Sequence, residues 1–183
     1  VWFTQFNTHA IGKMDSSGVF SEFFTPTPNT SPLGIALSGD GSVWFTEYTG
    51  DAIGHVSTAG VVTEYPLTVT GAGLTGITMA DDGTIWFTDY LNDTIGKMSA
   101  GGDINLYASG TTGARISDIA QATDGSLWFT ENGDNKIGTI TQDGIVTHYD
   151  LPTSNAGPID ITAGADGSLW FTESIGAIGT FTI

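Results

Sequence analysis

The hydrophobic and polar positions of this chain repeat with a period of 42 residues. The tripeptide Trp-Phe-Thr marks each repeat and begins at Trp2, Trp44, Trp86, Trp128 and Trp170. Between these landmarks, short apolar runs alternate with segments rich in Gly, Asp, Asn and Ser, and no window shows the periodicity of an amphipathic helix. A fixed period over the whole chain predicts a repeat architecture built of β-strands.

Each repeat is predicted to form four short strands, A to D. In the second repeat, strand A covers 34–37, strand B covers 43–47, strand C carries Ile53-Gly54 and strand D covers 61–65. An Asp-Gly dipeptide joins A to B and predicts a two-residue hairpin turn in which both residues have positive φ. The dipeptide recurs at Asp40, Asp82, Asp124 and Asp166, and Ile-Gly recurs at Ile11, Ile53, Ile95, Ile137 and Ile178.

Repeats of about 40–45 residues with four strands each are typical of β-propeller blades. A solenoid of β-arches is the alternative, but its repeats are shorter. We therefore predict an all-β protein, one β-propeller segment of four-stranded antiparallel blades. The predicted blades are 1–31 (partial), 32–73, 74–115, 116–157 and 158–183 (partial).

The strand order at the two ends predicts a partner for this segment. The chain starts at a strand B and finishes after a strand C, so the ends cannot merge into one blade, because both supply B and C. We expect the remaining blades of a seven-bladed or larger propeller, or a second copy, to complete the ring, since open sheet edges recruit other strands.

The charge balance excludes some partners. The chain has 20 acidic and 4 basic residues, a formal net charge of −16, and no cysteine. Nucleic-acid binding needs a basic surface, and anionic membranes repel so acidic a protein. No apolar run is long enough to span a bilayer, so no membrane insertion is expected. The composition favours an extracellular or cell-surface setting.

The segment Asp-Gly-Ser-Val-Trp-Phe-Thr-Glu at 40–47, followed by Ile53-Gly54 and Val-Thr-Glu-Tyr-Pro-Leu at 62–67, resembles the repeat of the virginiamycin B (streptogramin B) lyase family. The resemblance covers essentially the whole chain. It implies a seven-bladed propeller and an enzyme that opens cyclic streptogramin B antibiotics by elimination, with a histidine base and Mg²⁺.

The catalytic histidines of that family stand in a Pro-His-x-Ile motif at the start of strand A. The matching positions in this chain hold no histidine: they are Leu33, Thr75, Ser117 and Ile159. One of the family's magnesium-binding glutamates maps to Ser31, Gly73, Arg115 and Gly157, none of them acidic. We therefore predict no catalytic residue within this chain.

The resemblance and the strand order give candidate metal and ligand sites. The last residue of each Trp-Phe-Thr-Glu element matches the family's other magnesium glutamate, which predicts Mg²⁺ or Ca²⁺ ligands at Glu47, Asp89, Glu131 and Glu173. We expect these acids in a partial ring at the mouth of the central channel, with Asp118 and Asp160 beside them. Arg115, Asp118 and Asp160 are the candidate ligand-binding residues. For each acid, a hydrogen bond from a neighbouring loop or a backbone N–H group is the alternative role. For Arg115 the alternative is an ion pair with Asp118 or a nearby glutamate.

The functional prediction is accordingly a lyase-like propeller that acts as a binding or structural module. A small molecule or a protein would bind at the channel mouth. The alternative is an active carbon–oxygen lyase whose catalytic histidines lie outside this chain.

Overall fold

The computed structural model describes residues 1–183 and contains strands, turns and loops but no helix. Blade 1 has three strands: β1 (Trp2–Gln5), β2 (Ala10–Met14) and β3 (Phe20–Phe24). Blade 2 has β4 (Pro32–Leu37), β5 (Val43–Glu47), β6 (Ala52–Val56) and β7 (Val62–Pro66). Blade 3 has β8 (Leu74–Met79), β9 (Ile85–Asp89), β10 (Thr94–Met98) and β11 (Ile104–Ala108). Blade 4 has β12 (Ile116–Gln121), β13 (Leu127–Glu131), β14 (Lys136–Ile140) and β15 (Val146–Asp150). Blade 5 has β16 (Pro158–Ala163), β17 (Ser168–Glu173) and β18 (Ala177–Thr182).

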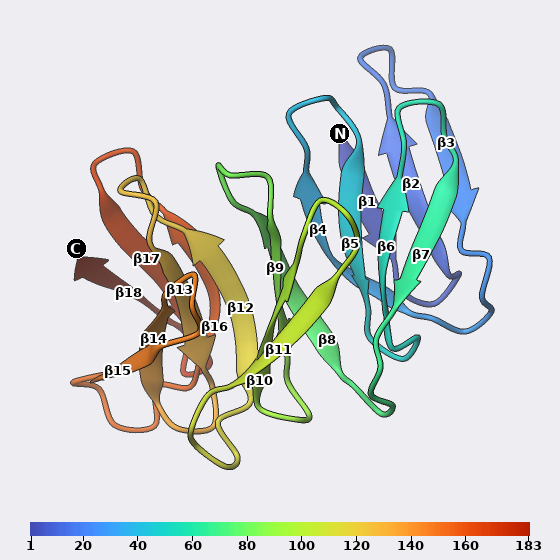
Figure 1. The fold of residues 1–183 in the computed structure, drawn as a ribbon. Helices are drawn as coiled ribbons and strands as arrows, with labels where there is room; N and C mark the ends of the chain where they lie inside the picture. The colour runs from blue at the N-terminus through green and yellow to red at the C-terminus, as the bar shows by residue number, and fades with distance from the viewer.

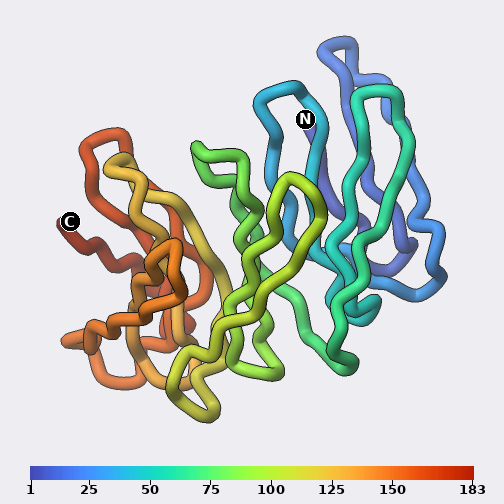
Figure 2. Tube along the Cα trace, viewed as in Figure 1, coloured from blue at the N-terminus to red at the C-terminus, as the bar shows by residue number.

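The strands form five separate antiparallel sheets, each in sequence order, which confirms the predicted all-β propeller architecture. The sheets stand side by side in an arc, and the chain passes from one end of the arc to the other (Figure 1). The two termini lie at opposite ends of that arc (Figure 2). Contacts between blades run through the inner strands, where β4 meets β8, β8 meets β12 and β12 meets β16. No helix in the structure could cross a membrane.

The Asp-Gly turns differ from the predicted two-residue hairpin. Only the glycine has positive φ, for example +89° at Gly41. The aspartate instead accepts hydrogen bonds from the residue two positions later: the Asp40 carboxylate receives the Ser42 amide at 2.9 Å and its hydroxyl at 2.6 Å. The same pattern holds for Asp82 and Asp124. The aspartate stabilises the turn through its side chain, so it needs no left-handed backbone.

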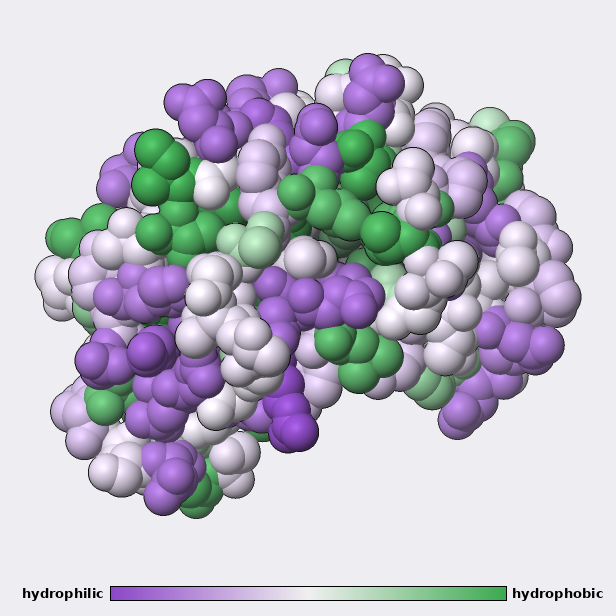
Figure 3. All heavy atoms as spheres, turned by 60° about the horizontal axis from the view of Figure 1, so that its bottom comes forward, coloured by the Kyte–Doolittle hydropathy of each residue, from purple (hydrophilic) through white to green (hydrophobic).

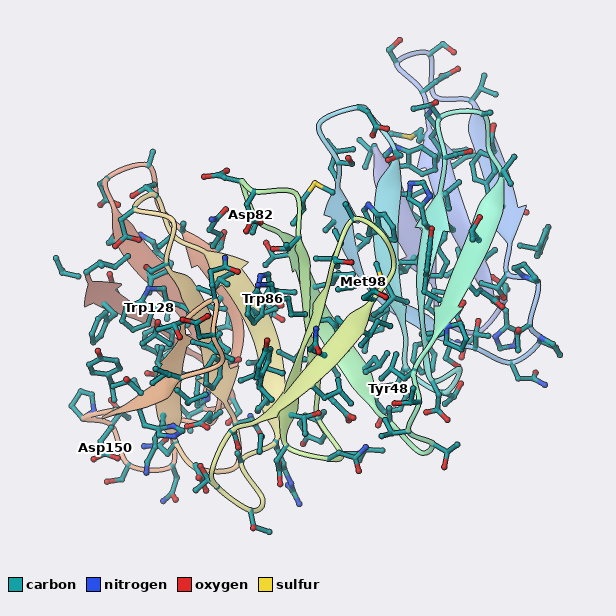
Figure 4. The ribbon with its side chains drawn as sticks, viewed as in Figure 1. Tyr48, Asp82, Trp86, Met98, Trp128 and Asp150 are labelled. Atoms are coloured by element: carbon teal, nitrogen blue, oxygen red, sulfur yellow. The ribbon has the colours of Figure 1, made fainter.

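The Trp-Phe-Thr and Ile-Gly elements are complementary parts of one core. The Phe ring of β5 lies over Gly54 of β6, where a Cβ atom would collide with Phe45. The Trp and Ile side chains point the other way, toward the next blade. Trp86 and Ile95 of blade 3 pack on Ile119 and Leu127 of blade 4. Figure 4 shows Trp86 and Trp128 inside the molecule, and both are buried.

Candidate functional site

The inner strand of each complete blade contains an irregularity near its start. Pairing between strands A and B shifts after the first residue and resumes three positions later, as between Pro32 and Ile35 of β4. The shift recurs in β8, β12 and β16. In each of the four blades that have an inner strand, the ladder therefore bypasses two residues: Leu33 and Gly34, Thr75 and Gly76, Ser117 and Asp118, Ile159 and Asp160. Such bulges turn side chains out of the regular pleat.

The bypassed residues of four blades line one pocket. Its volume is about 300 Å³, and its lining consists of those residues: Leu33, Gly34, Thr75, Gly76, Ser117, Asp118, Ile159 and Asp160. The first residue of each pair occupies the position that matches the lyase histidine. The inner strands begin at the end shown at the bottom of Figure 1, which Figure 3 turns toward the viewer. Apolar and hydrophilic side chains are mixed on that end (Figure 3). The structure thus brings the four matching positions together in a mixed polar and apolar hollow.

Asp118 is the ionisable group most firmly fixed in this pocket. Its carboxylate accepts a hydrogen bond from the Ile161 amide of the next blade at 3.0 Å. Burial raises the pKa of Asp118 to about 6, against the lowering effect of the amide bonds, and Asp160 adds a smaller upward contribution. Asp160 itself is exposed. The two predicted ligand-binding aspartates therefore share one pocket.

Arg115 forms no ion pair with these carboxylates. Its backbone amide donates to Asp93 at 2.7 Å, and the residue has a positive φ of 51°. The structure's two ion pairs involve Lys136 and His148, so Arg115 does not pair with Asp118. Ligand binding by Arg115 stays a prediction.

The acids at the ends of the B strands lie inside the blades. Glu47, Asp89 and Glu131 have no solvent exposure. Asp89 accepts hydrogen bonds from the amides of Gly73, Leu91 and Asn92 at 3.0–3.2 Å, and one from the Asn92 side chain at 2.8 Å. Asp89 thus plays the alternative, hydrogen-bonded role. Glu173, in the last blade, is partly exposed.

The other two buried acids face a strand D residue 17 positions later, a pairing that sequence reasoning missed. Glu131 reaches His148 at 2.9 Å, and the equivalent Gln5 of blade 1 donates to Glu22 at 2.9 Å. In blade 2 the residue at the same spacing is another acid, Glu64. Glu47 meets no N–H or hydroxyl donor. Burial, and then Glu64, raise the pKa of Glu47 to about 8.

The geometry can be compared with the needs of Mg²⁺ or Ca²⁺. Ca²⁺ takes six to eight oxygen ligands from carboxylates, carbonyls and waters, whereas Mg²⁺ takes six and usually keeps several waters beside one or two carboxylates. The four predicted metal ligands stand in four different blades, and no group of three or more His, Asp or Glu side chains comes close enough to share an ion. As placed, these residues do not form such an oxygen cage. Binding of Mg²⁺ or Ca²⁺ by these four acids stays a prediction.

Fold and pocket together define a class: a β-propeller whose blades carry a lyase-type repeat and whose inner strands form a ligand-sized hollow. The model of the virginiamycin B lyase family matches residues 1–115 and 70–183, which together span the chain. The chain therefore belongs to the virginiamycin B lyase family.

Solved structures agree with this assignment. A streptogramin B lyase structure superposes with a TM-score of 0.92 at 41% identity, covering 100% of this chain and 64% of that one. The virginiamycin B lyase from Staphylococcus aureus gives a TM-score of 0.91 at 36% identity, covering 100% of this chain and 66% of that one. A catalytically inactive variant of the same enzyme, solved with quinupristin, matches equally well. The chain thus spans about two thirds of the length of these relatives. A search of curated protein sequences found no match.

Proposed function

We propose that this chain is the binding part of a lyase-like propeller, and that its ligand occupies the pocket on the inner strands. One observation carries the proposal: the four positions that match the lyase histidine lie together in one hollow, and none of them is a histidine. Binding needs a shaped, mixed surface, which the hollow has. Elimination also needs a positioned base with a suitable pKa, which these four positions do not supply.

The family relationship suggests the kind of ligand. A relative was solved with quinupristin, so quinupristin is the first ligand to test. Asp118 and Asp160 add negative charge to the pocket lining. They favour a ligand that presents hydrogen-bond donors or a positive charge to this wall. The proposed setting is a secreted or surface protein.

Carbon–oxygen lyase activity is the second candidate, favoured by the relatives' identities of 36–41%. In this alternative, histidines from outside residues 1–183 complete the site. The pocket of this chain then supplies one wall of an active site rather than the whole of it.

Two terminal surfaces support a partner that completes the ring. At the last blade, Trp170 and Ile178 line an open apolar pocket of about 270 Å³. At the first blade, Val1 and Trp2 line another of about 400 Å³ with residues of blade 2. We propose that further blades of the same protein or of a second copy cover both.

Calorimetric titration with quinupristin tests the proposed function, and product analysis by mass spectrometry on the same samples separates the two candidates. We expect binding, no ring-opened product above a no-protein control, and weaker binding by Ser117→Trp, which fills the pocket. Repeating the titration with Mg²⁺ and with Ca²⁺ tests the metal prediction. Any gain in quinupristin affinity that depends on the metal should be lost in Glu131→Gln. Ring-opened product would favour the lyase instead.

A further inference from the structure

The threonines of the three central Trp-Phe-Thr elements are fully buried. Thr46, Thr88 and Thr130 have no solvent exposure, although each carries a hydroxyl group. Burying a hydroxyl is costly unless it is hydrogen-bonded, so each must find partners inside the protein. These partners turn out to be the backbone of the bulges that line the pocket.

The hydroxyl first accepts a hydrogen bond from the bulge of its own blade. Thr46 receives the Gly34 amide at 2.8 Å, and Thr88 receives the Gly76 amide at 2.8 Å. In blades 4 and 5, Thr130 receives the Asp118 amide and Thr172 the Asp160 amide, both at 3.1 Å. In every blade the donor is the second residue of the bypassed pair. Its amide has left the strand ladder, and the hydroxyl replaces the lost acceptor.

The same hydroxyl then donates its proton to the next blade. The acceptor is each time the carbonyl of the first bypassed residue, at the position that matches the lyase histidine. The bonds are Thr4 to Leu33 at 2.9 Å, Thr46 to Thr75 at 2.7 Å, Thr88 to Ser117 at 3.2 Å and Thr130 to Ile159 at 2.6 Å. One hydroxyl therefore joins the bulges of two adjacent blades.

These bonds follow one another along the pocket wall. We call Thr4, Thr46, Thr88, Thr130 and Thr172 the hydroxyl belt. Thr4 makes only the second bond, because blade 1 has no inner strand, and Thr172 makes only the first within residues 1–183. The three central threonines make both. Hydrophobic packing at the same junctions is non-directional, whereas these bonds fix the position of one backbone segment relative to the next.

We propose that the hydroxyl belt positions the pocket: its threonines hold each bulge open and set the spacing between the backbone segments that carry the pocket side chains. Without the hydroxyl, a buried amide and a buried carbonyl would lose their partners together. The inner strand would then gain by returning to regular pairing. A slip of one residue turns side chains to the opposite face of a strand, so the pocket lining would be lost. This role concerns the pocket proposed above to bind a ligand, but its test needs no ligand.

Amide hydrogen exchange, followed by NMR on the folded protein, tests the belt at blade 4. Thr130→Val removes the hydroxyl with little change in shape, and Thr130→Ser retains it. We expect exchange of the Asp118 amide to become at least about tenfold faster in the valine variant, which corresponds to about 1.4 kcal/mol of lost protection. The Ile159 resonances in the next blade should shift as well. The serine variant should keep both close to wild type.

Two further variants keep the test decisive. Thr139→Val is the matched control, because the Thr139 hydroxyl donates to the Leu127 carbonyl within one blade at 2.9 Å and touches no bulge. It should leave the Asp118 amide unchanged. If Thr130→Val does not fold, Thr172→Val replaces it, since that exposed site makes one belt bond and should affect only the Asp160 amide. Unchanged exchange at Asp118 and Asp160, or failure of serine to restore it, would overturn the positioning role. A failure to bind quinupristin would leave the exchange result standing and would count against the proposed function alone.

Discussion

Trp86 and Trp170 occupy the same place in the repeat but have different surroundings. Trp86 is fully buried because the aliphatic side chains of blade 4 cover it. Trp170 ends the series with 44% of its surface exposed, and the neighbouring Ile178 is 71% exposed. The motif therefore specifies a face for packing, and the next blade determines whether that face is buried. This is the nearest-neighbour behaviour expected of repeat proteins, in which each unit depends on the one beside it.

The largest expected difference lies between the two tryptophans themselves. Trp86→Ala should reduce the free energy of unfolding by about 3–5 kcal/mol, because it removes a fully buried indole and leaves a cavity. Trp170→Ala should cost less than half as much in the isolated chain. Urea denaturation followed by circular dichroism measures both. Equal losses would show that blade 5 is already covered, for instance by a second copy.

The pH dependence of folding stability should distinguish one blade junction from the others. Blades 2 and 3 have Gly34 and Gly76 where blade 4 has Asp118, so only the later junction carries this titrating group. The folded-state pKa of Asp118, about 6, lies above the ordinary aspartate value of 3.8. Protonated Asp118 therefore contributes fully to folding stability below pH 3.8, and this contribution is lost as the pH rises through 6.

We expect this loss of folding stability to amount to about 3 kcal/mol. Melting temperatures between pH 3 and pH 8 measure it, and Asp118→Asn should flatten that part of the profile. A profile that is the same for both proteins would assign the titration to other groups.

The smallest expected effects concern the pairs between strands B and D. His148→Ala should cost about 1–2 kcal/mol, since it leaves the buried Glu131 without its partner. Glu47→Gln should be close to neutral, because the amide can donate to Glu64 as Gln5 donates to Glu22. Thermal unfolding at pH 7 compares the two. A large loss in Glu47→Gln would mean that the Glu47 carboxyl has a role that an amide cannot supply.

Much of the fold was predictable because a repeat states the same information several times. The 42-residue period, the buried tryptophans and the Ile-Gly glycine all follow from single positions that recur. The pairs such as Glu131 and His148 were not predicted, because they depend on how two non-adjacent strands are registered. The signal was present as a spacing of 17 residues, but it is masked by different residue types in each blade. The burial of Glu47 depends likewise on register and on side-chain direction.

The bulges also escaped prediction, since nothing in the residue types of Leu33-Gly34 or Ser117-Asp118 marks them as bypassed by the ladder. They are specified from a distance, by a threonine one strand away. Only the three-dimensional arrangement shows that Thr46 and Gly34 act together. The sequence analysis matched Leu33, Thr75, Ser117 and Ile159 to one family position and placed Asp118 and Asp160 near the channel mouth, but it did not reveal that a bulge brings them into one pocket.

The bypassed pairs have a consequence for how such proteins can change. Leu33, Thr75, Ser117 and Ile159 differ in size and polarity, although the residues around them repeat closely. The belt contacts the backbone carbonyls of all four. Thr75 alone also reaches the belt with its side chain, whose hydroxyl lies 2.9 Å from that of Thr88. Substitution at Leu33, Ser117 and Ile159 should therefore be nearly free of cost to folding, so variants can exchange one recognition chemistry for another while the scaffold stays intact.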